Sequence, residues 1–249
     1  MSEFFLLFLI SFIANTFSAF AGGGAGLLQL PVLLFLGLPF SVALATHKLA
    51  SVALGIGATV RHFREGSLNW HFSLVILFAG LPGVIVGALS IVHIADRPAE
   101  LALGVLTMGL GIYSVLQRNL GQSQELKQLT RIQLFIGYAV LFCIGVLNGS
   151  LASGTGLFVT IWLVRWFGLD YKQAVAYTLV LVGLFWNGLG ALTLAMQSSI
   201  RWDWVPILFF ASMLGGYVGA HLAIKKGNKW IKITYEVITL AVGAKLILG

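Results

Sequence analysis

Long runs of apolar residues, separated by few charges, constrain this chain more than any other feature of its sequence. Ten such runs lie at residues 3–20, 27–38, 41–61, 70–92, 99–117, 133–150, 157–167, 172–195, 203–224 and 231–248. About 20 apolar residues in a helix cross the hydrocarbon core of a bilayer. Charged residues make up 9% of the chain, against about 25% in a soluble domain. The sequence therefore predicts an all-α integral membrane protein and excludes a soluble enzyme.

The basic residues indicate topology rather than a nucleic-acid partner. The net charge is +7, but no basic cluster has the interleaved aromatics typical of a groove that follows a phosphate backbone. Two Lys or Arg residues lie in 61–64, three in 118–131, two in 165–172 and four in 225–232, whereas the alternate connections contain only Arg97 and Arg201. Cytoplasmic loops are enriched in Lys and Arg. This bias predicts that the first set of connections is cytoplasmic and that both termini lie outside.

The first apolar run is interpreted as a membrane helix that is retained. It ends in Ala19-Phe20-Ala21, which is similar to a signal-peptidase site, but its start carries Glu3 and no basic residue. A secretory signal peptide begins with a basic segment. In addition, a similar stretch recurs in the middle of the chain.

The two halves of the chain align with each other. A shift of 130 places Gly24-Ala-Gly-Leu27 on Gly154-Thr-Gly-Leu157, a shift of 131 places Gly37-Leu38 on Gly168-Leu169, and a shift of 132 places Gly83 on Gly215 and Gly111 on Gly243. We expect two repeats, residues 1–117 and 133–249, of about five helical segments each, joined by a cytoplasmic linker at 118–132. Equivalent connections at 61–70 and 196–202 fall on opposite sides of the membrane, so the repeats are predicted to be inverted, as is typical of secondary transporters.

The second segment of each repeat is too short to cross the bilayer. Residues 27–38 extend about 18 Å as a helix, against about 30 Å of hydrocarbon. Each short segment follows a flexible turn, at 21–26 and at 150–156. Irregular backbone at membrane depth is tolerated only where protein or a wet cavity surrounds it. The sequence thus predicts short broken or re-entrant helices that meet near the midplane.

Two such turns are suited to binding an anion. Glycines can direct successive amide N–H groups into one concavity, and the N-terminus of the following helix carries a partial positive charge. The turn residues expected to bind the anion are Gly22, Gly23, Gly24, Ala25 and Gly26 in the first half and Ser153, Gly154, Thr155 and Gly156 in the second. The alternative is that the glycines only allow helices to approach closely.

A lysine inside an apolar run adds charge to this hypothesis. Lys48 has no acidic residue within a helical turn, and an ammonium in the membrane is costly unless it is paired. A bound anion would pair with it, while neighbouring Thr46 and His47 would donate hydrogen bonds or carry a proton. The polar groups expected to complete the site are Gln29, Asn148, Thr178 and Asn187. The alternatives are that Lys48 reaches the membrane interface and that the other groups bond neighbouring helices.

The motifs around these residues resemble those of the TauE/SafE sulfite-exporter family of membrane permeases. The resemblance covers nearly the whole chain and rests on Phe20-Ala-Gly-Gly-Gly-Ala-Gly-Leu27 with Pro31, Gly37-Leu-Pro39, Ala43-Leu-Ala-Thr-His-Lys-Leu49, Ser153-Gly-Thr-Gly156 and Gly168-Leu-Asp170. His47 stands where the family pattern favours a small polar residue. The family is often described as eight spans from a duplicated four-span unit, whereas the ten segments here count each glycine hairpin as two.

The resemblance implies a secondary carrier of small sulfur-containing anions, such as sulfite or organosulfonates, in the bacterial cytoplasmic membrane. The expected partners are the small anion and membrane lipid, and both proton coupling and a homodimer are compatible with the sequence. No catalytic motif and no requirement for a cofactor is found in the sequence. An anion channel, a carrier of another small organic or inorganic anion, a metal or neutral-solute carrier and a non-transporting membrane subunit stay open as alternatives.

Overall fold

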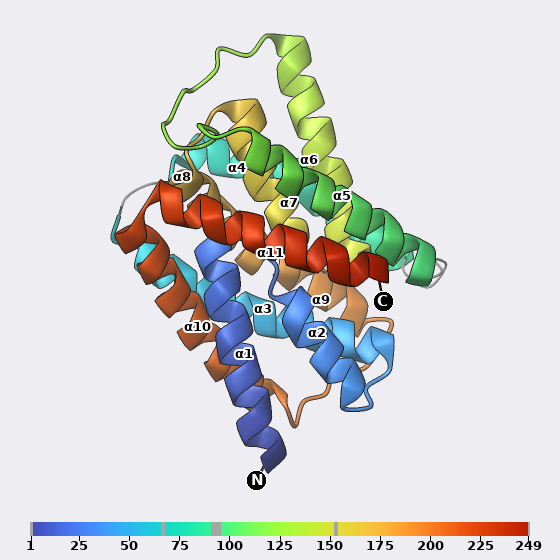
Figure 1. Cartoon of the computed structure of the whole chain (residues 1–249). Helices are drawn as coiled ribbons and strands as arrows, with labels where there is room; N and C mark the ends of the chain where they lie inside the picture. Colours follow the sequence, from blue (N-terminus) through green and yellow to red (C-terminus); the bar gives the residue numbers. More distant parts are fainter. Residues whose placement is uncertain (1, 66–67, 91–95, 152–153, 249) are drawn as a thin grey trace.

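The computed structural model describes residues 2–65, 68–90, 96–151 and 154–248, which form ten continuous helical segments and contain no strand (Figure 1). The first half contains α1 (Ser2–Ala21), α2 (Gly26–Phe35), α3 (Phe40–Phe63), α4 (Trp70–Ser90) and α5 (Asp96–Leu116). The second half contains α6 (Arg131–Leu151), α7 (Thr155–Trp162) continued by η2 (Leu163–Phe167), α8 (Tyr171–Tyr177) continued by η3 (Thr178–Trp186) and α9 (Asn187–Ala195), α10 (Val205–Lys226) and α11 (Asn228–Leu248). The all-helical class is confirmed, and the ends of the predicted segments agree within three residues.

Six of the described helices are long and apolar enough to cross a membrane. They are Glu3–Ala21, Phe40–Phe63, Trp70–Ser90, Arg131–Ser150, Tyr171–Ala195 and Val205–Lys226. The second segment of each half is shorter, with 10 residues in α2 and 13 in the apolar helix Thr155–Phe167. These two short helices follow the glycine turns, as the sequence predicts.

Left-handed glycines set the ends of the short helices. Gly37, two residues after the end of α2, has φ +88°, and the amide of Leu38 donates to Leu33 O at 3.2 Å, which closes the helix C-terminus. Gly154 has φ +74° and precedes the first residue of α7. Because L side chains rarely adopt these angles, glycine is the residue that permits such abrupt starts and stops.

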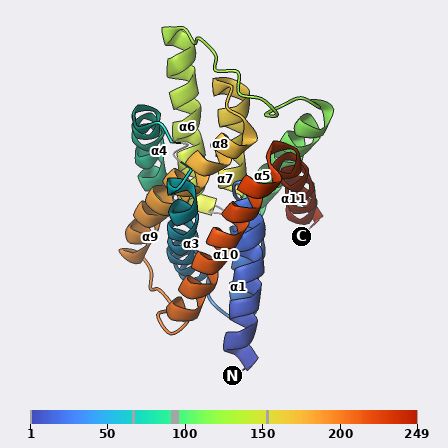
Figure 2. The ribbon, with the colours of Figure 1, turned by 90° about the vertical axis from the view of Figure 1, so that its left-hand side faces the viewer.

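Helices from opposite halves pack in two similar pairs. α1 packs against α10, and α4 packs against α6. In both pairs glycine lies directly against backbone. In the first pair, a Cβ on Gly215 would lie 2.6 Å from Phe12 O, and one on Gly219 would lie 2.2 Å from Thr16 O. In the second pair, a Cβ on Gly83 would lie 2.2 Å from Phe142 O, and one on Gly87 would lie 2.0 Å from Val146 O. Small residues allow membrane helices to approach this closely. α1 rises from the N-terminus at the bottom of Figure 2, whereas α6 descends from the top, so these two helices run in opposite directions.

The four basic connections gather at one end of the molecule. Lys172 lies 3.5 Å from the carboxylate of Glu65, and its amide donates to Asn228 Oδ1 at 2.9 Å. Asn228, the first residue of α11, in turn donates to Gln122 O at 3.0 Å, which links the start of α11 to the connection after α5. At the opposite end, Ser41 Oγ and Ser198 Oγ lie 3.1 Å apart. The connections that carry most of the basic residues therefore share one face.

Candidate functional site: a cavity between two glycine turns

The first glycine turn, 21–26, touches Gly156, the last residue of the second glycine turn, through the backbone. A Cβ on Gly23 would lie 2.6 Å from Gly156 C and from Leu157 N, and a Cβ on Gly156 would lie 3.0 Å from Gly23 Cα. Thr160 Oγ1, one turn along α7, donates to Gly22 O at 2.9 Å. Gly23 and Gly156 carry no side chain, so the two backbones lie in direct contact at this point.

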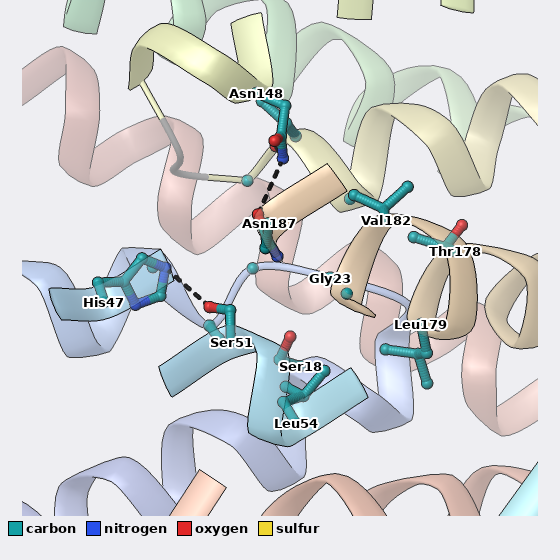
Figure 3. Close-up of a pocket in the computed structure, with 17 residues that line it drawn as sticks. Ser18, Gly23, His47, Ser51, Leu54, Asn148, Thr178, Leu179, Val182 and Asn187 are labelled. Atoms are coloured by element: carbon teal, nitrogen blue, oxygen red, sulfur yellow. Dashed lines mark hydrogen bonds between the residues drawn. The ribbon is translucent and has the colours of Figure 1, made fainter. Parts of the chain in front are cut away.

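A cavity of about 40 Å³ lies beside this contact (Figure 3). Its wall is formed by both turns together with residues of α1, α3, α6, η3 and α9. The residues are Ser18, Gly23, Gly24, Ala25, Gly26, His47, Ser51, Leu54, Asn148, Gly154, Thr155, Gly156, Thr178, Leu179, Val182, Gly183 and Asn187. Because about 10 to 15 Å³ of such volume holds one water molecule, the cavity has room for about three waters or one compact ion.

Several backbone amides in the wall are available as donors. Within the described residues, the amides of Gly22 and Gly23 donate to Ser18 O, at 2.9 and 2.8 Å, whereas those of Gly24, Ala25 and Gly26 have no backbone acceptor. On the other side, the first such bond of α7 is Leu157 N to Gly154 O, at 2.9 Å. Two helix N-termini thus border one cavity, an arrangement that favours negative charge.

Lys48 lies fully buried behind this wall. Its Nζ donates to Asn148 O at 2.6 Å and to Asn148 Oδ1 at 3.2 Å, and it lies 3.5 Å from Asn187 Oδ1. Gly190 makes room for it, because a Cβ at Gly190 would lie 3.1 to 3.2 Å from the end of the lysine side chain. No carboxylate among the described residues forms an ion pair with Lys48. The polar partners of this cation are therefore one backbone carbonyl and two amide side chains, all of them neutral.

The two asparagines connect Lys48 to the cavity. Asn148 Nδ2 donates to Thr155 Oγ1 at 2.9 Å and lies 3.3 Å from Asn187 Oδ1. The Asn187 amide nitrogen has no hydrogen-bond acceptor within the described part of the chain, and Figure 3 shows it directed away from Asn148. Since the Asn187 oxygen faces Lys48 and Asn148, its NH₂ group is left as a donor at the cavity wall.

The structure brings together most of the residues that the sequence indicated. Eleven of them line the cavity: Gly23, Gly24, Ala25, Gly26, His47, Asn148, Gly154, Thr155, Gly156, Thr178 and Asn187. Lys48 and Gln29 lie one hydrogen bond behind the wall, through Asn148 and His47 respectively. Gly22 packs on Thr160.

The remaining two predicted residues are Thr46 and Ser153. Thr46 is apart from the cavity, because its hydroxyl donates to Val42 O and accepts from the Arg201 amide at 3.0 Å. Ser153 lies outside the described residues.

Sequence reasoning missed six residues of the wall, namely Ser18, Ser51, Leu54, Leu179, Val182 and Gly183. Two of them carried a usable signal. Ser18 is the counterpart of Asn148 under the shift of 130, and Ser51 lies one helical turn after His47. Applied to the polar residues one by one, the internal alignment would have identified Ser18. The apolar members carry no such signal, because they differ in no way from ordinary core residues.

Six candidate spans and a buried polar cavity define the class of protein: a multi-pass helical membrane protein. The sequence profile of the family described as "Sulfite exporter TauE/SafE" matches residues 7–246. The chain belongs to this family.

Curated relatives cover the chain nearly from end to end. A "Probable membrane transporter protein" of Haemophilus influenzae is 27% identical over 97% of this chain and 93% of its own length. A "Probable membrane transporter protein ORF9" of Sinorhizobium sp is 28% identical over 97% of this chain and 91% of its own length. The "Probable membrane transporter protein YfcA" of Escherichia coli K12 is 25% identical over 97% of this chain and 88% of its own length. The membership in the family and the transporter class are thus supported along the whole chain.

Proposed function

We propose that the protein is a secondary transporter of small sulfur-containing anions, with the cavity between the two glycine turns as its substrate site. The observation that carries this proposal is the convergence of two helix N-termini on a buried cavity beside Lys48, a buried cation without an ion pair among the described residues. Such a site favours an anion, because amide dipoles and a buried ammonium are stabilised by negative charge. The family name supplies the sulfur chemistry.

The size of the cavity supports a compact substrate. About 40 Å³ accommodates an ion of the size of sulfite or sulfate more readily than a longer organosulfonate, which needs the wall to move apart. Lining side chains such as Ser18, His47 and Thr178 are at most 4% exposed. We infer that loading and release require the wall to open further, first to one side of the membrane and then to the other.

The duplication offers a way to open the site alternately, because equivalent positions line the cavity in pairs. Under the shifts of 130 and 131, these pairs are Ser18 with Asn148, Gly24 with Gly154, Ala25 with Thr155, Gly26 with Gly156, His47 with Thr178 and Ser51 with Val182. We infer inverted repeats, residues 1–117 and 133–249, that rock against each other around the anion. The antiparallel directions of α1 and α6 support this inference.

The same proposal gives the orientation in the bacterial cytoplasmic membrane. The shared face of the four basic connections is the cytoplasmic one, and the linker 118–132 lies on that side. Both termini are then outside. Tagging each terminus and the linker for accessibility in whole cells and in permeabilised cells tests this arrangement.

A direct test compares binding and transport in purified protein. Sulfite, sulfate, thiosulfate, taurine and sulfoacetate are titrated into the protein in detergent, and uptake is then followed in proteoliposomes. We expect saturable uptake of at least one compact anion. Uptake that rises linearly with concentration would indicate a channel, and failure of all five anions to bind would reject the proposal.

Two matched pairs of variants locate the site. Lys48→Met keeps the aliphatic stem but removes the charge, and should weaken anion binding at least about tenfold, since hydrogen bonds to charged groups contribute about 1.5 to 3 kcal/mol. Lys245→Met removes an exposed lysine from another apolar helix and should leave binding unchanged. Likewise, Thr178→Val should weaken binding, whereas Thr46→Val should not, because only Thr178 lines the cavity.

A further inference from the structure

A chain of four buried polar side chains ends at the cavity. Gln29 Nε2 donates to Ser11 Oγ at 2.8 Å, and Gln29 Oε1 lies 2.8 Å from His47 Nδ1. His47 Nε2 lies 3.3 Å from Ser51 Oγ. All four side chains are at most 3% exposed, while His47 and Ser51 line the cavity (Figure 3).

The direction of each hydrogen bond in this chain follows from the first one. The NH₂ group of Gln29 faces Ser11, so its carbonyl oxygen faces His47 and can only accept. His47 Nδ1 must therefore carry a proton. In a neutral imidazole the other nitrogen is then an acceptor, and the hydroxyl of Ser51 donates to it.

The direction of these hydrogen bonds decides whether Ser51 can donate a proton to an anion in the cavity. While His47 is neutral, the single hydroxyl proton of Ser51 is committed to the imidazole, so Ser51 presents only oxygen lone pairs to the cavity. When His47 is protonated, both ring nitrogens donate. Ser51 Oγ then accepts from Nε2, and its own proton is free to donate to the anion.

We propose that the central cavity binds its anion together with one proton, which His47 takes up, and that Ser51 reverses its hydroxyl in response. The inference rests on the proposed function, because it concerns the same site. The positive imidazolium is compensated by the anion, and the anion gains one donor. By linkage, protonation strengthens anion binding to the same degree that the anion favours protonation.

The charges around His47 fit this coupling. Lys48 is its charged neighbour, and an imidazolium beside that buried ammonium is unfavourable unless an anion is present. Of the elements packed against α3, the described residues of α2, η3 and α9 contain no titratable side chain. The titratable groups of the other packed elements are engaged away from His47. Glu3 lies at the exposed start of α1, and Arg201 pairs with Asp203 after α9. On α8, Tyr171 bonds Ser114, Lys172 bonds Glu65 and Tyr177 bonds Asn69. α10 carries Tyr217, His221, Lys225 and Lys226, of which His221 bonds Arg61.

The test counts protons taken up with the anion. Methanesulfonate and sulfate are used as probes because their charges stay constant between about pH 5 and 8, where histidine titrates. Calorimetric titrations in two buffers of different ionisation enthalpy give the number of protons bound per anion. We expect up to one proton in the unaltered protein, with affinity that falls about tenfold per pH unit in the upper part of the range.

Variants assign the proton to one residue. His47→Gln should abolish the proton uptake and make the remaining affinity independent of pH, whereas His71→Gln, an exposed histidine at the start of α4, should retain both. Ser51→Ala should weaken anion binding and reduce its pH dependence. A role of His47 in packing alone would change affinity without changing the number of protons.

The outcomes separate this inference from the proposed function. If an anion binds the unaltered protein without proton uptake, or if uptake persists in His47→Gln, the inference is overturned and the anion site stands. If neither probe binds and the wider anion panel also fails, the proposed function falls, and the inference with it. If only sulfite binds, the same proton count is made with sulfite after subtraction of its own ionisation, measured in protein-free solution. With methanesulfonate or sulfate, the unaltered protein by itself gives the count, so a variant that fails to fold leaves the test intact.

Discussion

The contact between the two glycine turns predicts a large difference between two otherwise similar substitutions. Gly23 and Gly37 both have positive φ, +146° and +88°. A Cβ at Gly23 would lie 2.6 Å from the backbone of Gly156 and Leu157, whereas a Cβ at Gly37 would meet nothing within 4 Å. Gly37→Ala therefore incurs only backbone strain, while Gly23→Ala incurs strain and a collision of two main chains.

Backbone strain and the collision together set the expected loss of unfolding free energy. Backbone strain costs about 1 to 2 kcal/mol for a left-handed L-residue. Overpacking adds about 1 to 3 kcal/mol, because carbon atoms need about 3.5 Å and the turns must separate by about 1 Å. Gly23→Ala should thus lose about 2 to 5 kcal/mol of unfolding free energy, and Gly37→Ala about 1 to 2 kcal/mol.

Thermal unfolding in detergent measures the difference, and anion titration measures its effect on the site. At about 2 to 4 °C per kcal/mol for a chain of this size, Gly23→Ala should melt below Gly37→Ala by at least a few degrees. It should also bind anion more weakly, because the displaced turn carries donors of the cavity wall. Equal melting temperatures, or unchanged anion affinity in Gly23→Ala, would refute the reasoning that the two turns touch and form the site.

Three further predictions concern the basic end of the molecule. Glu236→Ala removes the partner of Lys232, which is largely buried beside it, and should lower the unfolding free energy by about 2 to 3 kcal/mol, seen as a lower melting temperature that Glu236→Asp partly restores. Asp170→Ala removes the side chain that caps α8 and should cost about 1 kcal/mol, whereas Asp170→Asn should cost less. The hydrogen bond from Arg61 lowers the pKa of exposed Glu65. This carboxylate therefore stabilises the fold above its unfolded pKa of about 4.3, and its contribution is lost as the pH falls through the lower folded pKa. The melting temperature of Glu65→Gln should accordingly lie below that of the unaltered protein at neutral pH and approach it in acid.

The sequence predicted the helices well because a membrane makes their signal strong. Long apolar runs have few alternatives in a bilayer, where every backbone group must be bonded within the segment. Even the short second segments were visible, since Gly37 and Gly154 mark their ends in the sequence and adopt left-handed angles in the structure. The all-helical class and the segment ends within three residues followed from these local features.

The wall of the cavity could be predicted only where residue chemistry is unusual for a membrane. His47, Asn148 and Asn187 stand out as polar groups in apolar runs, and all three line the cavity. Thr46 stands out equally, yet it bonds the connection after α9. Threonine can satisfy its hydroxyl on its own helix, so its presence in an apolar run does not reveal which way it faces.

The amino-acid sequence by itself determined that this chain crosses a membrane, where its helices begin and end, and that two glycine turns interrupt it, because these properties depend on residues close together along the chain. Only the tertiary structure decided that the turns touch, that Lys48 lies behind Asn148 and Asn187 rather than in the wall, and that Gln29 orients His47 towards Ser51. Those arrangements join residues up to 139 positions apart. Their geometry depends on how helices from the two halves pack, and no local pattern records it.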